Sequence, residues 1–492
     1  MMDSITFLLV SISILLSTCL YLINPRRKPS KLPPGPRPLP IIGNLLQLGP
    51  NPHQSLAELS KKYGPLMYLK LGSKHTIVVS SPDIAKEVLQ KHDQVLSSRP
   101  HPVVITTHGH HEASVVWLPS GGPWRFRRKI LKEHMFSQQR LDSSQDSRQE
   151  MHHKLSDFVQ GFSESGRAVD VSELAFATSL DLISSSLFST DFDSETSKEL
   201  LKIERAVFQL AGEPNVADYF PFLRFLDPQR LERKSEVVMG KLLGKFDDMV
   251  ERRLGAESGT GIKDDLLEAL LEISRKSGSE FTRHHVVHLL SDLFIAGTDT
   301  TSTTVEWVMA ELMHNPEKMA KLKNELRTFV GENARIEEPD ISKLPYLQAV
   351  LKETLRLHPA APLLVPHKAA ASVEINGYTI PKDAEILVNV WAIGRDPSKW
   401  SNPSSFEPER FLEGKVDVRG FDFELLPFGS GRRICPGMSF AYRMINLTVA
   451  TLVHNFDWKL EGEERPETMD MSEKFEFSLQ KAVPLKAIPV RA

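Results

Sequence analysis

Cysteine is the residue type that most restricts the chemistry open to this chain. The 492 residues include two cysteines, and Cys19 lies inside an apolar N-terminal run. Cys435 therefore has no partner for a disulfide or a cysteine-rich zinc site in the globular part of the chain. It can act as a nucleophile or as a single thiolate ligand of a metal.

The stretch around Cys435 favours the role of a ligand. Glycine and arginine make up half of residues 428–437. Glycines let the backbone approach a large flat group closely, and neighbouring guanidinium groups, those of Arg432 and Arg433, stabilise a thiolate. A heme iron with an axial cysteine needs a loop of this kind. The alternative is a buried structural cysteine in a glycine-rich turn.

Five residues of this loop stand at a characteristic spacing. Phe428, Gly431, Arg433, Cys435 and Gly437 resemble the heme-binding signature of cytochrome P-450 monooxygenases. The resemblance implies that heme b is the cofactor and that Cys435 is the axial ligand of its iron. It also implies that the other four residues help to bind the heme.

A second stretch, residues 296–301, reads Ala-Gly-Thr-Asp-Thr-Thr inside a predicted helix. Small residues and consecutive threonines are poor mid-helix choices, and threonine hydroxyls compete for backbone carbonyls. The string is similar to the oxygen-binding signature of the same family. This similarity implies that Ala296 and Gly297 leave room for dioxygen. It implies further that Asp299 and Thr300 form a catalytic acid–alcohol pair that relays protons.

A third motif joins Glu353 and Arg356, which are three residues apart in a predicted helix. A pair of this kind is ordinarily a surface ion pair of small value. The family resemblance implies instead a buried structural triad with Arg410, from the Pro-Glu-Arg-Phe segment at 408–411. The triad is expected to brace the loop around the heme.

Other positions are implied to contact the heme propionates or the substrate. Trp124 and Arg128 are four apart and share a helical face, and the resemblance assigns them to the propionates together with Arg99 and His367. Solvated side chains and ordinary core packing are the alternatives. The predicted substrate pocket is apolar and comprises Val103, Val104, Ile105, Trp117, Phe208, Leu363, Leu364, Val365 and Phe477.

These residues are expected on a mainly α fold with a small β region, which by resemblance is the cytochrome P-450 fold. The chain is 41% hydrophobic and carries a net charge of −3, which gives no support for nucleic-acid binding. No linker or repeat divides it, so one domain is predicted over 41–492.

Residues 99–118 are expected to be irregular. Helices are predicted over 53–63, 82–90, 284–314, 346–357 and 438–455, strands over 68–70, 76–80, 373–375 and 386–390, and a hairpin over 475–479.

The N-terminus is predicted to be a membrane anchor. Residues 5–23 are apolar and uncharged, just long enough to span a bilayer, and basic residues follow at 26–28. The positive-inside rule then places the domain in the cytosol, at the endoplasmic reticulum membrane. We predict a single transmembrane helix at 4–24, a basic and proline-rich hinge at 25–40, and contact with membrane lipid. A cleaved signal peptide is the alternative, but its basic residues would precede the apolar run.

The motifs together predict a heme-thiolate monooxygenase that resembles microsomal plant members of the family. Residues 215–221 and 227–229 look like the branch that includes geraniol hydroxylases and ferruginol synthase, which implies a small terpenoid substrate, a monoterpenol or a diterpene. Because no convincing dinucleotide fingerprint is present, electrons are expected from NADPH through NADPH–cytochrome P-450 reductase. The alternatives are a heme-thiolate isomerase or dehydratase, and a heme-binding protein without catalysis.

Overall fold

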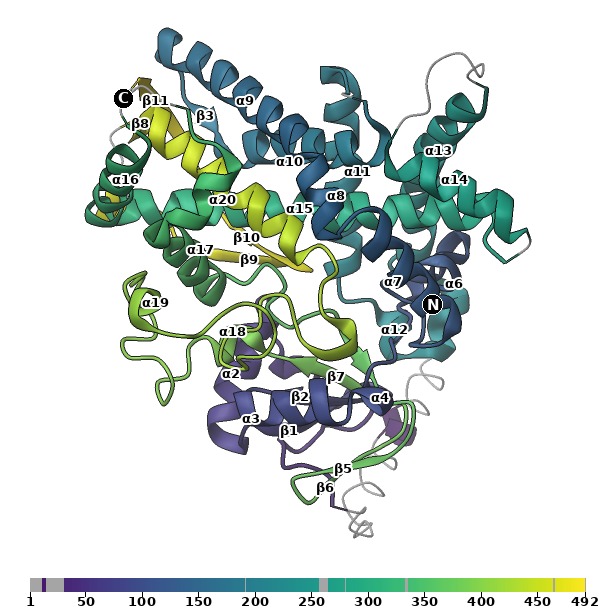
Figure 1. Ribbon diagram of the computed structural model, residues 1–492. Helices are drawn as coiled ribbons and strands as arrows, with labels where there is room; N and C mark the ends of the chain where they lie inside the picture. The colour runs from purple at the N-terminus through teal and green to yellow at the C-terminus, as the bar shows by residue number, and fades with distance from the viewer. Residues whose placement is uncertain are drawn as a thin grey trace.

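The computed structural model describes residues 11–14, 31–190, 192–255, 264–278, 280–331, 335–462 and 465–491. Helices form most of the molecule, and the strands form a few small sheets (Figure 1). The predicted mainly α architecture with a small β region is therefore confirmed. Within the described ranges, no helix is both long and apolar enough to cross a bilayer. The predicted anchor at 4–24 lies almost entirely outside these ranges.

The longest helix, α15 (Arg283–His314), crosses the middle of the molecule (Figure 1). Its first turn is capped where the Thr282 N–H donates to His285 Nδ1 at 3.0 Å. Most of its side chains are buried, as expected of a helix that is covered on several sides. It packs on α10 (Val171–Phe188) and on α20 (Met438–Asn455), so it forms a fixed internal wall.

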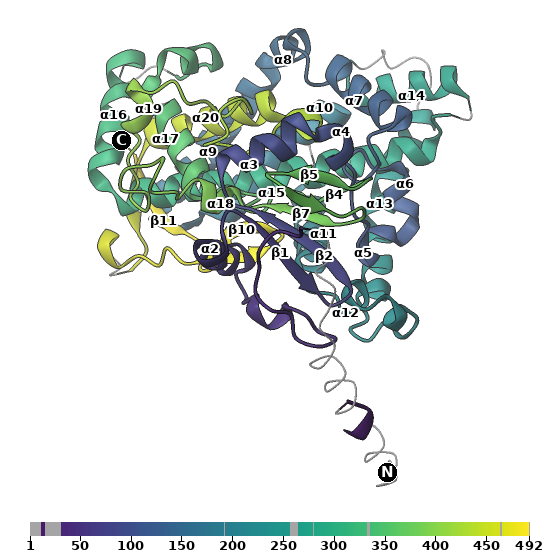
Figure 2. The same cartoon turned by 90° about the horizontal axis from the view of Figure 1, so that it is seen from below.

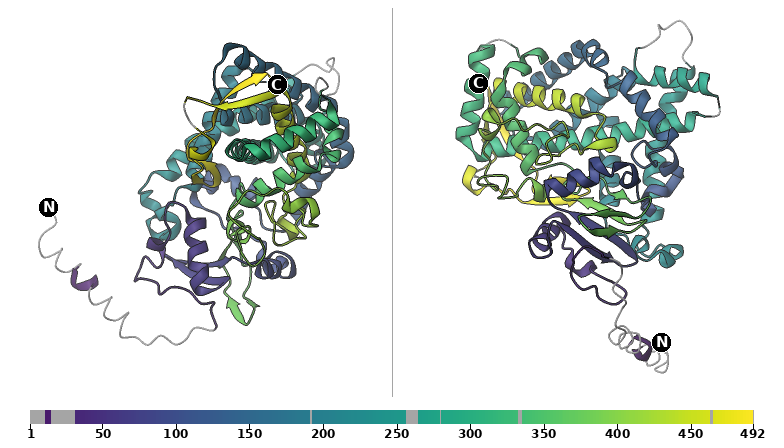
Figure 3. Two further views of the ribbon diagram at one scale, coloured as in Figure 1. Left: turned by 90° about the vertical axis from the view of Figure 1, so that its left-hand side faces the viewer. Right: turned by 60° about the horizontal axis from the view of Figure 1, so that its bottom comes forward.

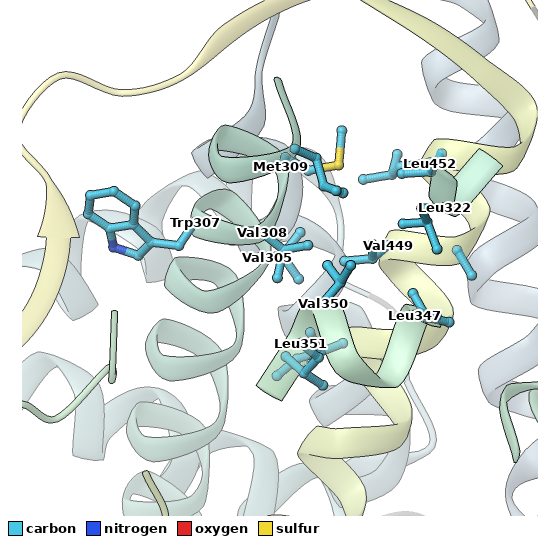
Figure 4. Close-up of a cluster of buried hydrophobic side chains, with 14 of the residues drawn as sticks. Val305, Trp307, Val308, Met309, Leu322, Leu347, Val350, Leu351, Val449 and Leu452 are labelled. Carbon is cyan, nitrogen blue, oxygen red and sulfur yellow. The ribbon is translucent and has the colours of Figure 1, made fainter. Parts of the chain in front are cut away.

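A large apolar cluster fixes three further helices against the C-terminal half of α15. Side chains of α16 (Pro316–Val330), α17 (Pro345–Leu357) and α20 meet those of α15 there. The labelled members in Figure 4 are Val305, Trp307, Val308, Met309, Leu322, Leu347, Val350, Leu351, Val449 and Leu452. Because close-packed side chains resist displacement, this cluster holds α17 and α20 in a defined position.

The remaining helices surround this centre. Predicted helices over 53–63, 284–314, 346–357 and 438–455 are observed within one residue of their expected bounds. The other α-helices are α2 (Pro52–Tyr63), α3 (Pro82–Lys86), α4 (Asp93–Leu96), α5 (Val103–Thr106), α6 (His110–Ala113), α7 (Gly122–His134), α8 (Gln138–Ser143), α9 (Gln145–Ser165), α11 (Ser194–Gly212), α12 (Val216–Tyr219), α13 (Leu231–Gly255), α14 (Leu266–Ser277), α18 (Val390–Ile393) and α19 (Arg410–Glu413).

The largest sheet has the strand order β1-β2-β7-β4 (Figure 2). Its strands are β1 (Leu66–Leu71), β2 (Lys74–Val79), β7 (Glu385–Val388) and β4 (His367–Lys368), and only β2 and β7 are parallel. A bridge between Ser98 and Lys368 joins the segment before α5 to β4. The sheet therefore brings residues near positions 98 and 367 together.

Three smaller sheets complete the structure. They pair β9 (Glu473–Glu476) with β10 (Ser478–Lys481), β5 (Val373–Ile375) with β6 (Tyr378–Ile380), and β11 (Lys486–Arg491) with both β3 (Val169–Asp170) and β8 (Phe456–Leu460). Strands β8 and β11 lie across the helical body from β1 and β2 (Figure 3), whereas Phe475 of β9 packs against the apolar cluster of α2 and β1. The β9–β10 pair is the predicted hairpin, and it lies against α15.

The segment 99–118 differs from the irregular structure that was predicted. It forms the short helices α5 and α6, joined by a 3-10 turn. Helices this short are unstable alone, so tertiary contacts must hold them. One such contact runs from the Ser114 hydroxyl to the Asp292 carboxylate of α15, at 2.8 Å. A helix was also predicted over 82–90, but α3 ends at Lys86 and continues as a wider π turn.

Candidate active site

Cys435 lies in a tight turn before the N-terminus of α20. Its N–H donates to the Phe428 carbonyl at 3.0 Å. Gly429 and Gly431 have φ angles of 69° and 65°, in the left-handed region that favours glycine. A side chain at Gly431 would also overlap the carbonyl oxygen of Leu89. The turn therefore requires glycine, and it fixes the direction in which the thiol points.

The sulfur of Cys435 faces an internal cavity. Burial raises the pKa of the Cys435 thiol, while the N–H groups of Gly437 and Met438 and the charge of Arg128 act to lower it. These N–H groups belong to the start of α20, where the helix dipole favours an anion. The surroundings therefore favour a thiolate only where a further positive charge, such as a metal ion, is bound to it.

The guanidinium that acts on this thiol is not one of the two expected from the sequence. Arg432 is exposed and pairs with Asp93 at 3.2 Å. Arg433 donates through Nε to the Ser97 carbonyl at 2.8 Å. The expectation that these two neighbours stabilise the thiolate is corrected by their local bonding, which turns both side chains toward other partners.

Five polar side chains surround one end of the cavity: Arg99, Trp124, Arg128, His367 and Arg433. They come from the segment before α5, from α7, from β4 and from the cysteine loop. The guanidiniums of Arg128 and Arg433 lie 5.7 and 4.6 Å from the Trp124 ring centroid. The structure thus brings together all the residues that were predicted to contact the propionates.

This group is positively charged without a matching acid. Arg99 Nη1 donates to the Val365 and Pro366 carbonyls at 2.5 and 2.8 Å, and His367 Nδ1 donates to the Leu96 carbonyl at 2.9 Å. No carboxylate of the described residues pairs with Arg99, Arg128 or Arg433, and Arg433 Nη1 is buried without a hydrogen-bond partner.

Burial and mutual repulsion make the charged forms of these side chains unfavourable. Burial and then the charge of Arg128 lower the pKa of Arg433 to about 10. Burial and then the charge of Arg433 lower the pKa of Arg99 well below its usual value. Burial and then Arg99 lower the pKa of His367 in the same way. A ligand with negative charge at this end of the cavity would relieve all three effects.

Heme b fits these residues. Its iron takes one axial thiolate, which Cys435 offers, and its two propionates would meet the unpaired cations, including the orphaned Arg433 Nη1. Phe428, Gly431 and Gly437 belong to the loop beneath the sulfur. A side chain at Gly437 would contact Phe136 at 3.5 Å and approach Cys435 Sγ at 4.0 Å, so glycine leaves space at this wall.

The opposite wall of the cavity is formed by α15. Ala296, Gly297 and Thr300 line it, and Ala296 is exposed although its helix is buried, because the cavity opens there. The Thr300 hydroxyl donates to the Ala296 carbonyl at 2.7 Å. A side chain at Gly297 would meet Ile183 Cδ1 at 2.5 Å. Small residues therefore keep both the cavity and the contact with α10 open.

Asp299 does not line this cavity with Thr300. It lies on the side of α15 that faces the β9–β10 hairpin, where Gln480 Nε2 donates to its Oδ1 at 3.1 Å. Burial raises the pKa of Asp299 to about 6. Its other oxygen, Oδ2, is buried without a hydrogen-bond partner among the described residues. The two members of the predicted pair therefore occupy different sides of one helical turn.

Glu353, Arg356 and Arg410 form a buried ion cluster, as predicted. Arg356 donates through Nε and Nη2 to the Glu353 carboxylate at 2.7 and 2.8 Å, and Arg410 Nε donates to the same carboxylate at 3.0 Å. Glu353 is fully buried and Arg356 nearly so. Arg356 also donates to the carbonyls of Gly394 and Pro403. The cluster thereby ties α17 to the chain that leads into the cysteine loop.

Two of the nine predicted pocket residues, Leu364 and Val365, line the cavity. Leu363 instead packs in the apolar cluster of Leu56 and Met67 beneath the sheet. The positive φ of Leu364, 51°, marks the turn that separates these two neighbours. The prediction that Leu363 lines this cavity is therefore wrong.

The remaining predicted pocket residues lie elsewhere. Val104 packs with Leu210 and Leu231, and Ile105 lies against them. Val103 is buried in α5, where its N–H donates to Asp218 Oδ1 at 2.8 Å. The side chains of Val104 and Ile105 therefore meet α11 and α13, and none of the three residues lines the cavity.

Three predicted aromatic residues also lie outside the cavity lining: Trp117, Phe208 and Phe477. The Trp117 carbonyl oxygen bonds His101 Nε2 at 3.2 Å, and the Phe208 and Phe477 rings meet with centroids 6.2 Å apart. Other apolar residues line the cavity. Ala360 and Ala361 belong to the extended, proline-rich segment that by resemblance was expected to line the pocket. No sequence signal singled out the others, which include Val115, Val116, Ile183 and Leu293.

The buried triad should be needed both for stability and for heme binding. Glu353→Gln removes the charge that offsets two buried guanidiniums, so we expect the free energy of unfolding to fall by about 3–5 kcal/mol. Because the triad supports the chain before Cys435, the heme-to-protein ratio should fall as well. Chemical denaturation and heme content measure both effects.

Glu58→Gln is the matched control, because Glu58 and its partner Lys61 are each 70% exposed. It should change the unfolding free energy by less than about 0.5 kcal/mol. A Glu353→Gln protein with normal stability and full heme content would contradict the supporting role of the triad.

Comparisons with known proteins agree with this site. The cytochrome P-450 family model matches residues 33–485. The chain is 53% identical to cytochrome P-450 76T24 of Catharanthus roseus over 94% of both chains. It is also 48% identical to a ferruginol synthase of Salvia miltiorrhiza over 99% of both chains, and 47% identical to a geraniol 8-hydroxylase of Swertia mussotii over 98% of both. A single thiol facing a threonine-lined helix across one cavity, together with these matches, establishes that the chain belongs to the cytochrome P-450 family of heme-dependent monooxygenases.

Proposed function

We propose that this enzyme hydroxylates a small apolar terpenoid, with electrons that NADPH supplies through NADPH–cytochrome P-450 reductase. The observation that carries the proposal is the position of the Cys435 sulfur and of Thr300 on two walls of one cavity. Bound heme would supply the activation of dioxygen and the insertion of one oxygen atom. The residues described above bind, orient and manage protons around it.

The protein residues divide this work between the two walls. On one wall Cys435 would hold the heme iron, and the cationic cluster would hold the propionates. On the other, the hydroxyl of Thr300 holds a proton at the cavity surface, where it is bonded to the Ala296 carbonyl. Asp299, with its pKa of about 6, gains and loses a proton close to neutral pH.

The substrate class is inferred from the lining and from the relatives. Apolar side chains of Val115, Val116, Leu293, Leu364 and Val365 bound the cavity. They favour a hydrocarbon skeleton over a charged molecule. Geraniol and ferruginol, named in two relatives, are terpenoids of different size. A monoterpenol and a diterpene are therefore the two classes of substrate that we propose.

Turnover of a terpenoid panel tests this function. Purified full-length protein in lipid vesicles, with NADPH and the reductase, should convert geraniol or an aromatic abietane diterpene into a product that is heavier by one oxygen atom. Labelled dioxygen should place one labelled atom in that product. Product formation without NADPH would indicate a rearrangement enzyme, and no product from any terpenoid would contradict the proposed substrate class.

We further infer that the enzyme lies on the endoplasmic reticulum membrane, with residues 4–24 as its anchor and 41–492 in the cytosol. Exposed apolar side chains gather on two segments that flank the turn between β1 and β2. Gly72 N–H bonds the Ile42 carbonyl and Ser73 N–H bonds the Tyr219 carbonyl, so these segments are neighbours (Figure 2). The exposed residues are Leu39, Ile41, Leu46, Phe222, Phe225 and Leu226. They form a surface that suits membrane lipid.

Flotation with lipid vesicles tests this surface in a chain that begins at residue 31. Phe222→Ser together with Phe225→Ser should weaken vesicle binding at least tenfold, because each buried ring contributes about 1.5–3 kcal/mol. Phe158→Ser is the control, since Phe158 is 57% exposed on α9. Equal binding by the double variant and the control would contradict the proposed lipid contact.

A further inference from the structure

A second buried carboxyl group lies beside Asp299. Glu204 belongs to α11 and is 1% exposed. Its Oε1 is in hydrogen-bond contact with the hydroxyl of Thr298, the residue before Asp299. No basic side chain of the described residues forms an ion pair with Glu204. A glutamate buried in this way, without a cation to offset its charge, is unusual and needs a physical explanation.

The hydrogen bonds of Thr298 indicate which form Glu204 takes. The Thr298 oxygen is within bonding distance of both Glu204 Oε1 and the Phe294 carbonyl, the latter at 2.8 Å. A hydroxyl has one hydrogen to donate, and in a helix it commonly donates to the carbonyl four residues before it. The second bond then needs its hydrogen from Glu204. Both bonds are satisfied together when the Glu204 carboxyl is protonated.

The electrostatic environment of Glu204 also favours its protonated form. Burial, and after it the charge of Asp299, raise the pKa of Glu204 well above its ordinary value. Two other charged groups act on the pair: Arg205 of α11 favours ionisation of both carboxyls, and Glu476 of β9 opposes ionisation of Asp299. Near pH 7 the pair therefore holds one proton on Glu204 while Asp299 is largely ionised.

We propose that Glu204 is a positioning residue for proton delivery, which reloads Asp299 with protons during turnover. In this step a water molecule between the two carboxyls would take the proton of Glu204 and give one of its own to Asp299 Oδ2, which has no hydrogen-bond partner among the described residues. One O–H bond breaks at Glu204, one forms at Asp299, and the negative charge moves to Glu204. Water from the solvent then returns a proton to Glu204, and no other reactant is needed. The proposal rests on the proposed monooxygenase function, because dioxygen chemistry consumes the protons that Asp299 passes on.

Infrared spectroscopy tests the resting state of Glu204 without any turnover. At about pH 8, the difference spectrum between the wild-type protein and Glu204→Gln should contain the carbonyl stretch of a protonated carboxylic acid, shifted in D2O. Glutamine keeps a hydrogen-bond donor for Thr298, so this variant should fold. Glu199→Gln is the matched control, because Glu199 lies on the same helix and pairs with Lys245 at the surface. Absence of that band would overturn the proposal.

Turnover with geraniol as the probe tests the delivery of protons. At about pH 7.5, Glu204→Gln should lower the product formed per NADPH by about three- to tenfold, with more hydrogen peroxide and a larger solvent isotope effect. At about pH 6 the loss should be smaller, because Asp299 is then protonated in about half of the molecules. A purely structural role would not produce this dependence on pH.

Two further variants test whether Glu204 and Asp299 act on the same proton route. Asp299→Asn should lower the yield further, and adding Glu204→Gln to it should cost little more, because both residues serve one route. Unchanged yield and isotope effect in Glu204→Gln would overturn the delivery role. If the wild type forms no product from geraniol, the same variants are compared with the aromatic abietane diterpene as the probe. A lack of product from both would contradict the proposed substrate class, whereas the infrared result still decides whether Glu204 holds a proton.

Discussion

Positive charge around one cavity is the constraint on which the rest of the site depends. Arg99, Arg128 and Arg433 share the cavity end with a neutral His367. Arg99 and Arg433 bond backbone carbonyls, Arg128 lies over the Trp124 ring, and no described carboxylate balances the three charges. Cations removed from water without a counter-charge are costly. An anionic ligand that fills the cavity removes this cost. The propionates of heme b would supply that negative charge, and Cys435 would ligate its iron, so that one group would satisfy both halves of the site.

The scaffold is arranged to hold the two walls of this cavity at a fixed separation. One wall is α15, whose position is set by the apolar cluster that it shares with α16, α17 and α20 (Figure 4). The other wall is the cysteine loop, which is held by glycine-dependent turns at one end and by the Glu353 triad before it. The two ion clusters differ in kind. Carboxylates of the protein balance the triad, because Glu353 pairs with Arg356 and Arg410 and Glu407 pairs with Arg410 at 3.2 Å, whereas the cavity cluster needs a ligand.

The sequence was informative where a short stretch departs from ordinary composition. The loop of Cys435, the small and hydroxyl residues at 296–301 and the pair of Glu353 and Arg356 each break a local preference. Cys435, Ala296, Gly297 and Thr300 line the cavity and Glu353 pairs with Arg356, as their motifs predicted, whereas Asp299 lies outside the lining. The apolar lining was largely missed, because Val115, Val116 and Ile183 are ordinary core residues until tertiary contacts turn them toward the cavity. The direction of Asp299, away from Thr300, likewise depends on the hairpin that packs against α15 from far along the chain.

Ligation of the heme iron by the Cys435 thiolate can be tested with one visible spectrum. Purified full-length protein is reduced with dithionite, and its spectrum is recorded with and without carbon monoxide. Thiolate ligation predicts a strongly red-shifted Soret band in the carbon monoxide complex, and its loss in Cys435→Ser. A Soret band at the position of imidazole-ligated hemes, or failure of the protein to bind heme, would contradict thiolate ligation by Cys435.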